Sequence, residues 1–158
     1  MPTRRPDPQR LLAALNEQRA ELGRPAWAGL LTAEALADGC VGAVAAALDS
    51  GAVPCREALR AAAMRLLDLL AARVPGRAVE VRIPPYAAIQ CVPGPRHTRG
   101  TPPNVVETDA ATWVRLATGR LAWAAATADG LIRASGPRAD LAEYLPLRSG
   151  DGSADCCP

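Results

Sequence analysis

The densest group of polar side chains suited to chemistry lies in the segment 96–101, where two arginines, one histidine and two hydroxyl side chains surround a glycine. Arginine offers paired donors to a carboxylate or phosphate, and glycine lets the backbone approach a ligand. The segment therefore predicts an anionic head-group site made by Arg96, His97, Arg99 and Thr101, with Asn104 just beyond it. The alternative interpretation is a solvated loop whose arginines pair with Glu80, Glu107 or Asp109.

The single histidine and the five cysteines do not form a recognisable catalytic or metal-binding pattern. His97 has no aspartate or serine spaced around it as in a triad, and one histidine cannot make a metal site by itself. Cys91 lies in an apolar stretch, where a thiol usually packs as a small hydrophobic group. We therefore predict no catalytic residue, no metal and no cofactor.

Two tryptophans lie on consecutive short helical segments in the second half of the chain. Trp113 and Trp123, with Leu116 and Leu121 beside them, are large enough to line an apolar ligand cavity. Equally, these side chains can form part of an ordinary core. Trp27, which follows Pro25, is predicted to be a packing anchor between helices.

Composition narrows the classes of function. The net charge is +2. The 18 basic residues, all arginine, are spread along both halves of the chain with the 16 acidic residues nearby, so there is no basic stripe that would predict a nucleic-acid partner. Charged residues interrupt the longest apolar tract, 64–74, and the first ten residues do not resemble a signal peptide. The odd number of cysteines without a C-x-x-C spacing indicates reduced thiols. We expect a cytoplasmic protein without stable membrane insertion.

The first half of the chain predicts three helices, over 9–22, 32–48 and 54–74. Each has apolar residues at three- and four-residue intervals, and each ends near a glycine or proline. Thr32 is the expected N-cap of the second helix, and Gly51 its terminator. The third helix has the clearest period, through Leu59, Leu66 and Leu70. Residues 1–75 are therefore predicted to form an N-terminal helical region.

The hydrophobic period changes from helical to alternating at Ala78, where strands begin. Strands are predicted over 78–83, 86–92, 104–107 and 131–135. The second of these is apolar on both sides and is expected to lie inside the sheet. Helices return over 108–119, capped by Thr108 or Asp109, and over 121–128.

Helices followed by strands, with helices returning late, predict an α+β fold whose mostly antiparallel sheet is covered by helices. The expected organisation is an N-terminal helical region over 1–75, an α+β domain over 76–147 and a disordered tail over 148–158. Cys156 and Cys157 lie in that tail.

The α+β region resembles a known family. The run from Asp129 to Gly136, with Gly119-Arg120-Leu121 before it, resembles a segment of sterol carrier proteins of the second type, in which a short helix precedes the closing strand. The segment 90–109 is similar to actinobacterial orthologues of that family. The resemblance covers roughly residues 78–147 and implies an apolar cavity, a fold like that of the sterol carriers and a small, mainly apolar ligand.

The segment from Thr112 to Gly119 is also similar to the C-terminal domain of mycothiol-dependent maleylpyruvate isomerases. Their metal is held by several histidines, whereas this chain has only His97, so the metal and the isomerase activity are not implied. The leading hypothesis is a non-catalytic module that binds a lipid or acyl compound. The alternatives are an enzyme or enzyme accessory acting on thiol conjugates, and an adaptor that docks through its N-terminal helices.

Overall fold

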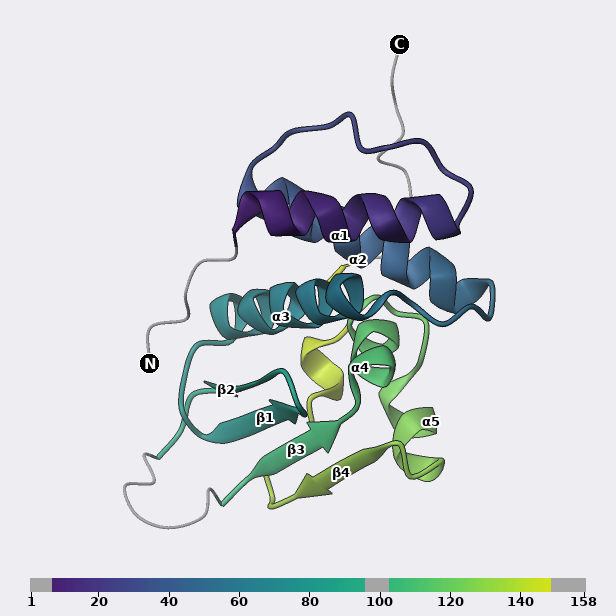
Figure 1. Ribbon diagram of the computed structural model, residues 1–158. Coiled ribbons are helices and arrows are strands. Elements are labelled where there is room, and N and C mark those ends of the chain that lie inside the picture. The colour runs from purple at the N-terminus through teal and green to yellow at the C-terminus, as the bar shows by residue number, and fades with distance from the viewer. Residues whose placement is uncertain (1–6, 96–102, 149–158) are drawn as a thin grey trace. The chain divides into compact units, whose positions relative to one another are not determined.

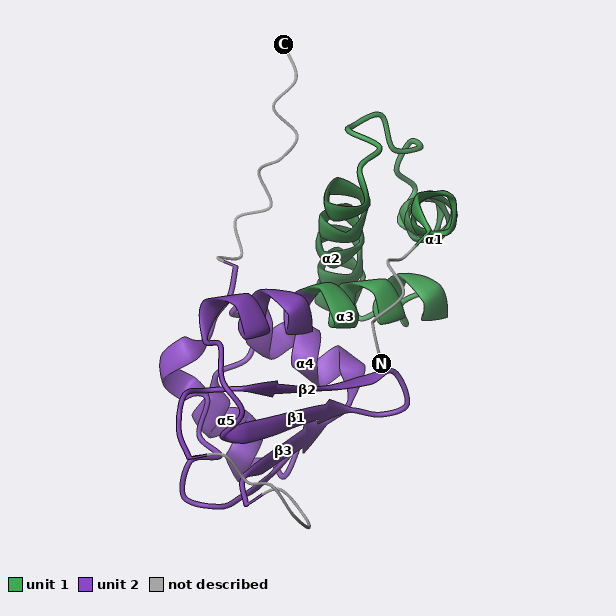
Figure 2. Cartoon of the chain, turned by 90° about the vertical axis from the view of Figure 1, so that its left-hand side faces the viewer, with its two compact units in different colours: residues 1–65 green, residues 66–158 purple. Residues whose placement is uncertain are grey.

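The computed structural model describes residues 7–95 and 103–148. The chain divides into two compact units, residues 1–65 and 66–158, coloured separately in Figure 2, and the division falls inside the third helix. Within the described residues, no helix combines the length and the apolar character needed to cross a bilayer.

Unit 1 is built from α1 (Pro8–Glu21), α2 (Ala33–Asp49) and the first part of α3 (Arg56–Arg73). Thr32 caps α2 by accepting a hydrogen bond from Ala35 N, and Gly51 adopts a positive φ after its last turn, as the sequence predicts. Leu15, Leu36 and Val44 are fully buried in the core of this unit.

Polar side chains also stabilise unit 1. Gln18 is buried, and its Oε1 accepts a hydrogen bond of 2.7 Å from the backbone N–H of Cys55. Asp38 and Arg65 form an ion pair at 2.8 Å that links α2 to α3. The segment before α3 is therefore fixed to α1 by a side chain that is 37 positions away in sequence.

Unit 2 contains a sheet of four strands, β1 (Val79–Ile83), β2 (Ala87–Cys91), β3 (Val105–Thr108) and β4 (Ile132–Ser135). The strand order is β2-β1-β3-β4; β1 and β3 are parallel, and the other two pairs are antiparallel. The predicted α+β class with a mostly antiparallel sheet is confirmed. Its helices are the end of α3, α4 (Ala110–Ala117) and α5 (Trp123–Ala128), followed by the 3-10 turn η1 (Ala142–Tyr144).

The sheet has one apolar and one polar face. Val79, Val81 and Ile83 of β1 are fully buried, whereas Glu80 and Arg82 between them form an ion pair on the opposite face. The helix α4 and the end of α3 lie over one side of the sheet (Figure 1). The buried core of unit 2 therefore lies between this apolar face and those helices.

The prediction that the second strand lies inside the sheet is wrong, because β2 is an edge strand. Its burial alternates, with Ala88 and Gln90 exposed and Cys91 buried. Ala87 and Ala88 made the segment apolar in composition. Alanine is small enough to be exposed at little cost, so an apolar run of this kind does not distinguish an edge strand from a central one.

Candidate functional site

The predicted head-group residues fall mainly in one segment. Arg96, His97, Arg99 and Thr101 lie outside the described residues. The residues on either side of this segment are described, and they meet at one end of the sheet. There, Ala78 N donates to Val92 O, and Glu80 N donates to Asn104 O, each at 3.0 Å.

Asn104 is 4% exposed, and both ends of its amide are bound within the chain. Its Nδ2 donates to the carbonyl oxygen of Ala78 at 2.8 Å, and its Oδ1 accepts from Arg138 N at 2.9 Å. Asn104 therefore links the start of β1, the start of β3 and the turn after β4. This geometry makes it a positioning residue for the predicted loop.

The turn after β4 contributes two residues that the sequence analysis missed. Gly136 has φ +97°, and a Cβ there would overlap the carbonyl oxygen of Pro103. Arg138 extends to the other end of the loop, where its Nη1 donates to Pro93 O at 3.0 Å and lies against Gly94. The only signal in the sequence is the pair Gly136-Pro137, which predicts a turn but not its partners.

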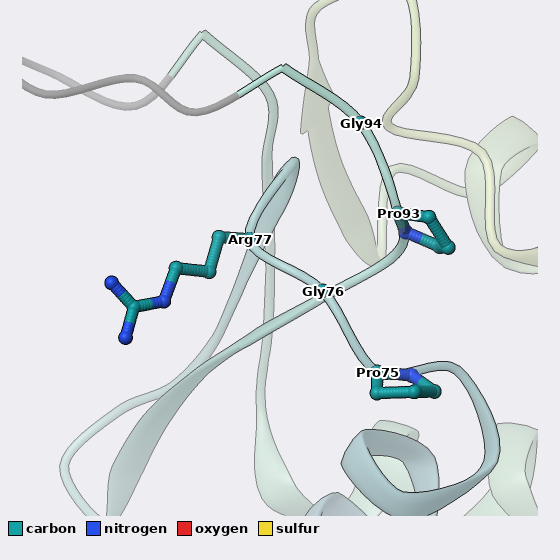
Figure 3. Close-up of a pocket in the computed structure, with 5 residues that line it drawn as sticks. All are labelled: Pro75, Gly76, Arg77, Pro93 and Gly94. Atoms are coloured by element: carbon teal, nitrogen blue, oxygen red, sulfur yellow. The ribbon is translucent and has the colours of Figure 1, made fainter.

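The segment before β1 passes close to the segment after β2. A depression of about 410 Å³ lies there, lined by Pro75, Gly76, Arg77, Pro93 and Gly94. Gly76 is required because a Cβ there would overlap the backbone of Val92 and Pro93. Figure 3 shows the two proline rings to one side of Gly76 and the Arg77 side chain extending away from them. Arg77 is exposed, and among the described residues it forms no hydrogen bond or ion pair.

The four predicted apolar residues separate into two pairs. Trp113 and Leu116 on α4 are 1% and 2% exposed, so both belong to the core of unit 2. Leu121, just before α5, and Trp123, its first residue, are half-buried. None of the four lines the 410 Å³ depression. These four apolar residues therefore lie in a different part of unit 2 from the depression that Arg77 lines.

A second depression, of about 220 Å³, lies where β3 leads into α4 and where β4 begins. Asp109 caps α4, as predicted, by accepting from both the backbone N–H and the hydroxyl of Thr112. Thr108 donates from its hydroxyl to Leu131 O at 2.7 Å. The side chains of Thr108 and Asp109 are therefore already hydrogen-bonded within the chain. The lining also includes Pro84, Glu107, Gly130 and Arg133.

Two cysteines in the described residues have strongly shifted acidities. Burial raises the pKa of Cys40 to about 12 and that of Cys91 to about 11, because desolvation disfavours the thiolate. Both thiols stay protonated at neutral pH and cannot act as nucleophiles in this state. Within residues 7–95 and 103–148, no three histidine, cysteine or acidic side chains gather in a way that could hold a metal ion.

Comparison with protein families finds a match over more than half of the chain. Residues 55–147, more than half of the chain, match the sequence profile of a family described as bacterial SCP orthologs, where SCP denotes sterol carrier protein. The match covers the whole sheet, α4, α5 and η1. No curated protein matches the chain.

Proposed function

Because this chain belongs to the bacterial sterol carrier ortholog family, we propose that unit 2 binds a small, largely apolar ligand, such as a lipid or acyl compound, without catalysing a reaction. The observation that carries the proposal is the family match over the complete sheet and its helices. The sheet contributes an apolar face, and α4 contributes Trp113 and Leu116 to the same buried layer. Affinity then comes mainly from burying apolar ligand surface.

We place the polar end of the ligand at the edge of unit 2 that carries Arg77. Arg77 is exposed and is one of the residues that line the 410 Å³ depression, and the adjoining segment of the sequence contains Arg96, His97, Arg99 and Thr101. Arg138 and Asn104 fix the two ends of that segment. A carboxylate or phosphate suits this edge because guanidinium groups bind such anions through paired hydrogen bonds.

The apolar part of the ligand is assigned to the side of unit 2 that holds Leu121 and Trp123. Both side chains are half-buried, so a guest can contact them without displacing the fully buried Trp113. Substituting Trp123 is therefore a more informative test than substituting Trp113, whose removal leaves a large cavity in the core and destabilises the fold.

Native mass spectrometry of the freshly purified full chain tests the proposal directly, because a bound lipid or acyl compound adds a defined mass. Titration with a fluorescent fatty-acyl probe and with a sterol probe provides the affinity. We expect saturable binding of at least one probe and weaker binding by Trp123→Ala. Unchanged tryptophan fluorescence and melting temperature across the whole panel would contradict the proposal.

The anionic end is tested separately by Arg77→Gln, with Arg115→Gln on α4 as the matched control, since both arginines are exposed. We expect Arg77→Gln to weaken binding of a fatty-acyl anion roughly three- to tenfold, because an interaction with an exposed arginine contributes about 1 kcal/mol. Binding of the corresponding neutral alcohol should stay unchanged in both variants. Equal effects on the acid and the alcohol would remove Arg77 from the site.

A further inference from the structure

The loop between α1 and α2, residues 22–32, exposes two neighbouring leucines. Leu30 is 73% exposed and Leu31 is 61% exposed, although most of the large apolar side chains in unit 1 are buried. Arg24 is the sole charged residue of this loop in the sequence. Neighbouring exposed leucines in a loop of this composition form an apolar patch of the kind that marks interaction surfaces.

Three hydrogen bonds that involve side chains hold the loop in a defined conformation, in addition to backbone hydrogen bonds at its start. Asn16 Oδ1 accepts from Trp27 N at 2.7 Å, and Arg19 Nε donates to Pro25 O at 2.7 Å. The indole N–H of Trp27 donates to Leu30 O at 3.1 Å. The loop runs back along α1 before α2 begins (Figure 1). The leucines are therefore presented outward by an anchored backbone.

Trp27 is central to this anchoring. A Cβ at Gly29 would come within 2.5 Å of the Trp27 ring, so only glycine allows the backbone to lie against the indole. Because the indole N–H is bound to Leu30 O, the ring needs no water partner and tolerates an apolar surrounding. The tryptophan expected to be a packing anchor between helices is half-buried and anchors this loop to α1.

Charges of both signs lie on α1 beside the loop, with Arg19 against Trp27 and the carboxylates of Glu17 and Glu21 near Cys55. The guanidinium carbon of Arg19 lies 5.7 Å from the centroid of the Trp27 ring, and Arg24 is exposed next to it. The carboxylates of Glu17 and Glu21 lie close enough to Cys55 to help raise the pKa of its thiol, after burial, which is the larger cause. In sequence, Glu21 directly precedes the loop, and Glu34 follows it in the first turn of α2.

We propose that the loop formed by residues 22–32 docks unit 1 onto the surface of an anionic lipid bilayer. Leu30 and Leu31 would enter the interfacial layer, and Arg19 and Arg24 would face the anionic head groups. Shallow insertion of leucine and tryptophan beside arginines suits this layer. A second copy of the chain fits less well, because two leucines provide far less than the roughly 800 Å² per partner of a stable interface.

Sedimentation of the full chain with vesicles of equal parts phosphatidylglycerol and phosphatidylcholine tests the proposal. Binding should weaken with added salt and be much lower on pure phosphatidylcholine vesicles. We expect Leu30→Glu/Leu31→Glu to reduce the partition coefficient by about tenfold or more, because each leucine loses its apolar transfer energy. Val53→Glu is the matched control, since Val53 is 93% exposed in the same unit, and it should bind as the parent does.

Trp27 provides a local readout that does not depend on ligand binding by unit 2. Vesicles containing brominated lipid should quench part of the tryptophan emission, and Trp27→Phe should remove that quenched part. Circular dichroism shows whether each variant remains folded.

Four results would overturn the proposal: no sedimentation with anionic vesicles, equal loss in Val53→Glu, quenching that persists in Trp27→Phe, or self-association that depends on the leucines without vesicle binding. The carrier proposal is judged by probe binding without vesicles, so failure of one does not imply failure of the other.

Discussion

At the scale of single residues, Asn104 shows how a polar side chain can resemble a ligand contact and serve the fold. Asn104 lies three residues after Thr101, and the sequence predicts it as part of the anionic site. In the structure, its buried amide connects three separate segments through hydrogen bonds to Ala78 and Arg138. A buried amide bound at both ends cannot reorient toward a ligand without leaving those partners unsatisfied.

Replacing Asn104 with alanine should lower the free energy of unfolding by about 3 kcal/mol, because two buried groups lose their partner. Urea denaturation followed by circular dichroism measures the change. Asn16→Ala is the control: it removes a single half-buried hydrogen bond, and its expected loss is about 1 kcal/mol. Equal stability of Asn104→Ala and the parent would show that the hydrogen bonds of Asn104 to Ala78 and Arg138 are not needed for stability.

Thiol acidity gives a second prediction at this scale. With a pKa of about 11, roughly a thousandth of Cys91 is thiolate at pH 8, and the fraction for Cys40, with a pKa of about 12, is smaller still. Both should resist maleimide in the native protein and react after denaturation. Peptide mapping by mass spectrometry after a timed pulse identifies the modified cysteines. Native labelling of Cys91 as fast as a free thiol would contradict its burial.

At the scale of elements, local sequence patterns predicted the helices well and the strand arrangement poorly. The period of α3, the caps Thr32 and Asp109, and the alternation in β1 depend on residues within a few positions of one another. The edge position of β2 and the parallel pairing of β1 with β3 depend on partners elsewhere in the chain. Period and propensity do not identify those partners.

A matched pair of glycine substitutions tests the element-level account of the turn after β4. Gly136→Ala should destabilise the protein by more than about 2 kcal/mol, because φ is +97° and the new Cβ overlaps Pro103 O. Gly42→Ala on α2 meets nothing within 4 Å and should stabilise by about 0.5–1 kcal/mol. Thermal unfolding of both variants measures the contrast. Two changes of the same sign would show that the turn can relax.

At the scale of the whole molecule, two compact units share one continuous helix. The sequence predicted a boundary at residue 75, where the helical period ends, whereas the compact units divide between Arg65 and Leu66. The family match begins at residue 55 and covers most of unit 2. Family membership therefore assigns a fold to the second unit, and the proposed docking loop lies in the first.

The described cysteines, Cys40, Cys55 and Cys91, are free thiols, so among the described residues each unit is stabilised by non-covalent packing. We therefore expect the melting temperature to be the same with and without a reducing agent, measured by differential scanning fluorimetry. The variant Cys156→Ser/Cys157→Ser avoids crosslinking through the terminal cysteines. A clear fall in its melting temperature on reduction would reveal a disulfide that contributes to stability.

The sequence by itself determined the class of fold, the order of helices and strands, and the family, because these depend on local periodicity, caps and short motifs. Tertiary structure alone decided the edge position of β2 and the hydrogen bonds of Asn104 to Ala78 and Arg138. It also decided the close contacts of Gly76, Gly136 and Arg138 with the segments on either side of the predicted loop. The physical reason is distance along the chain. The hydrogen bonds that hold this end of the sheet join residues 26, 34 and 45 positions apart, and no local pattern encodes such pairs.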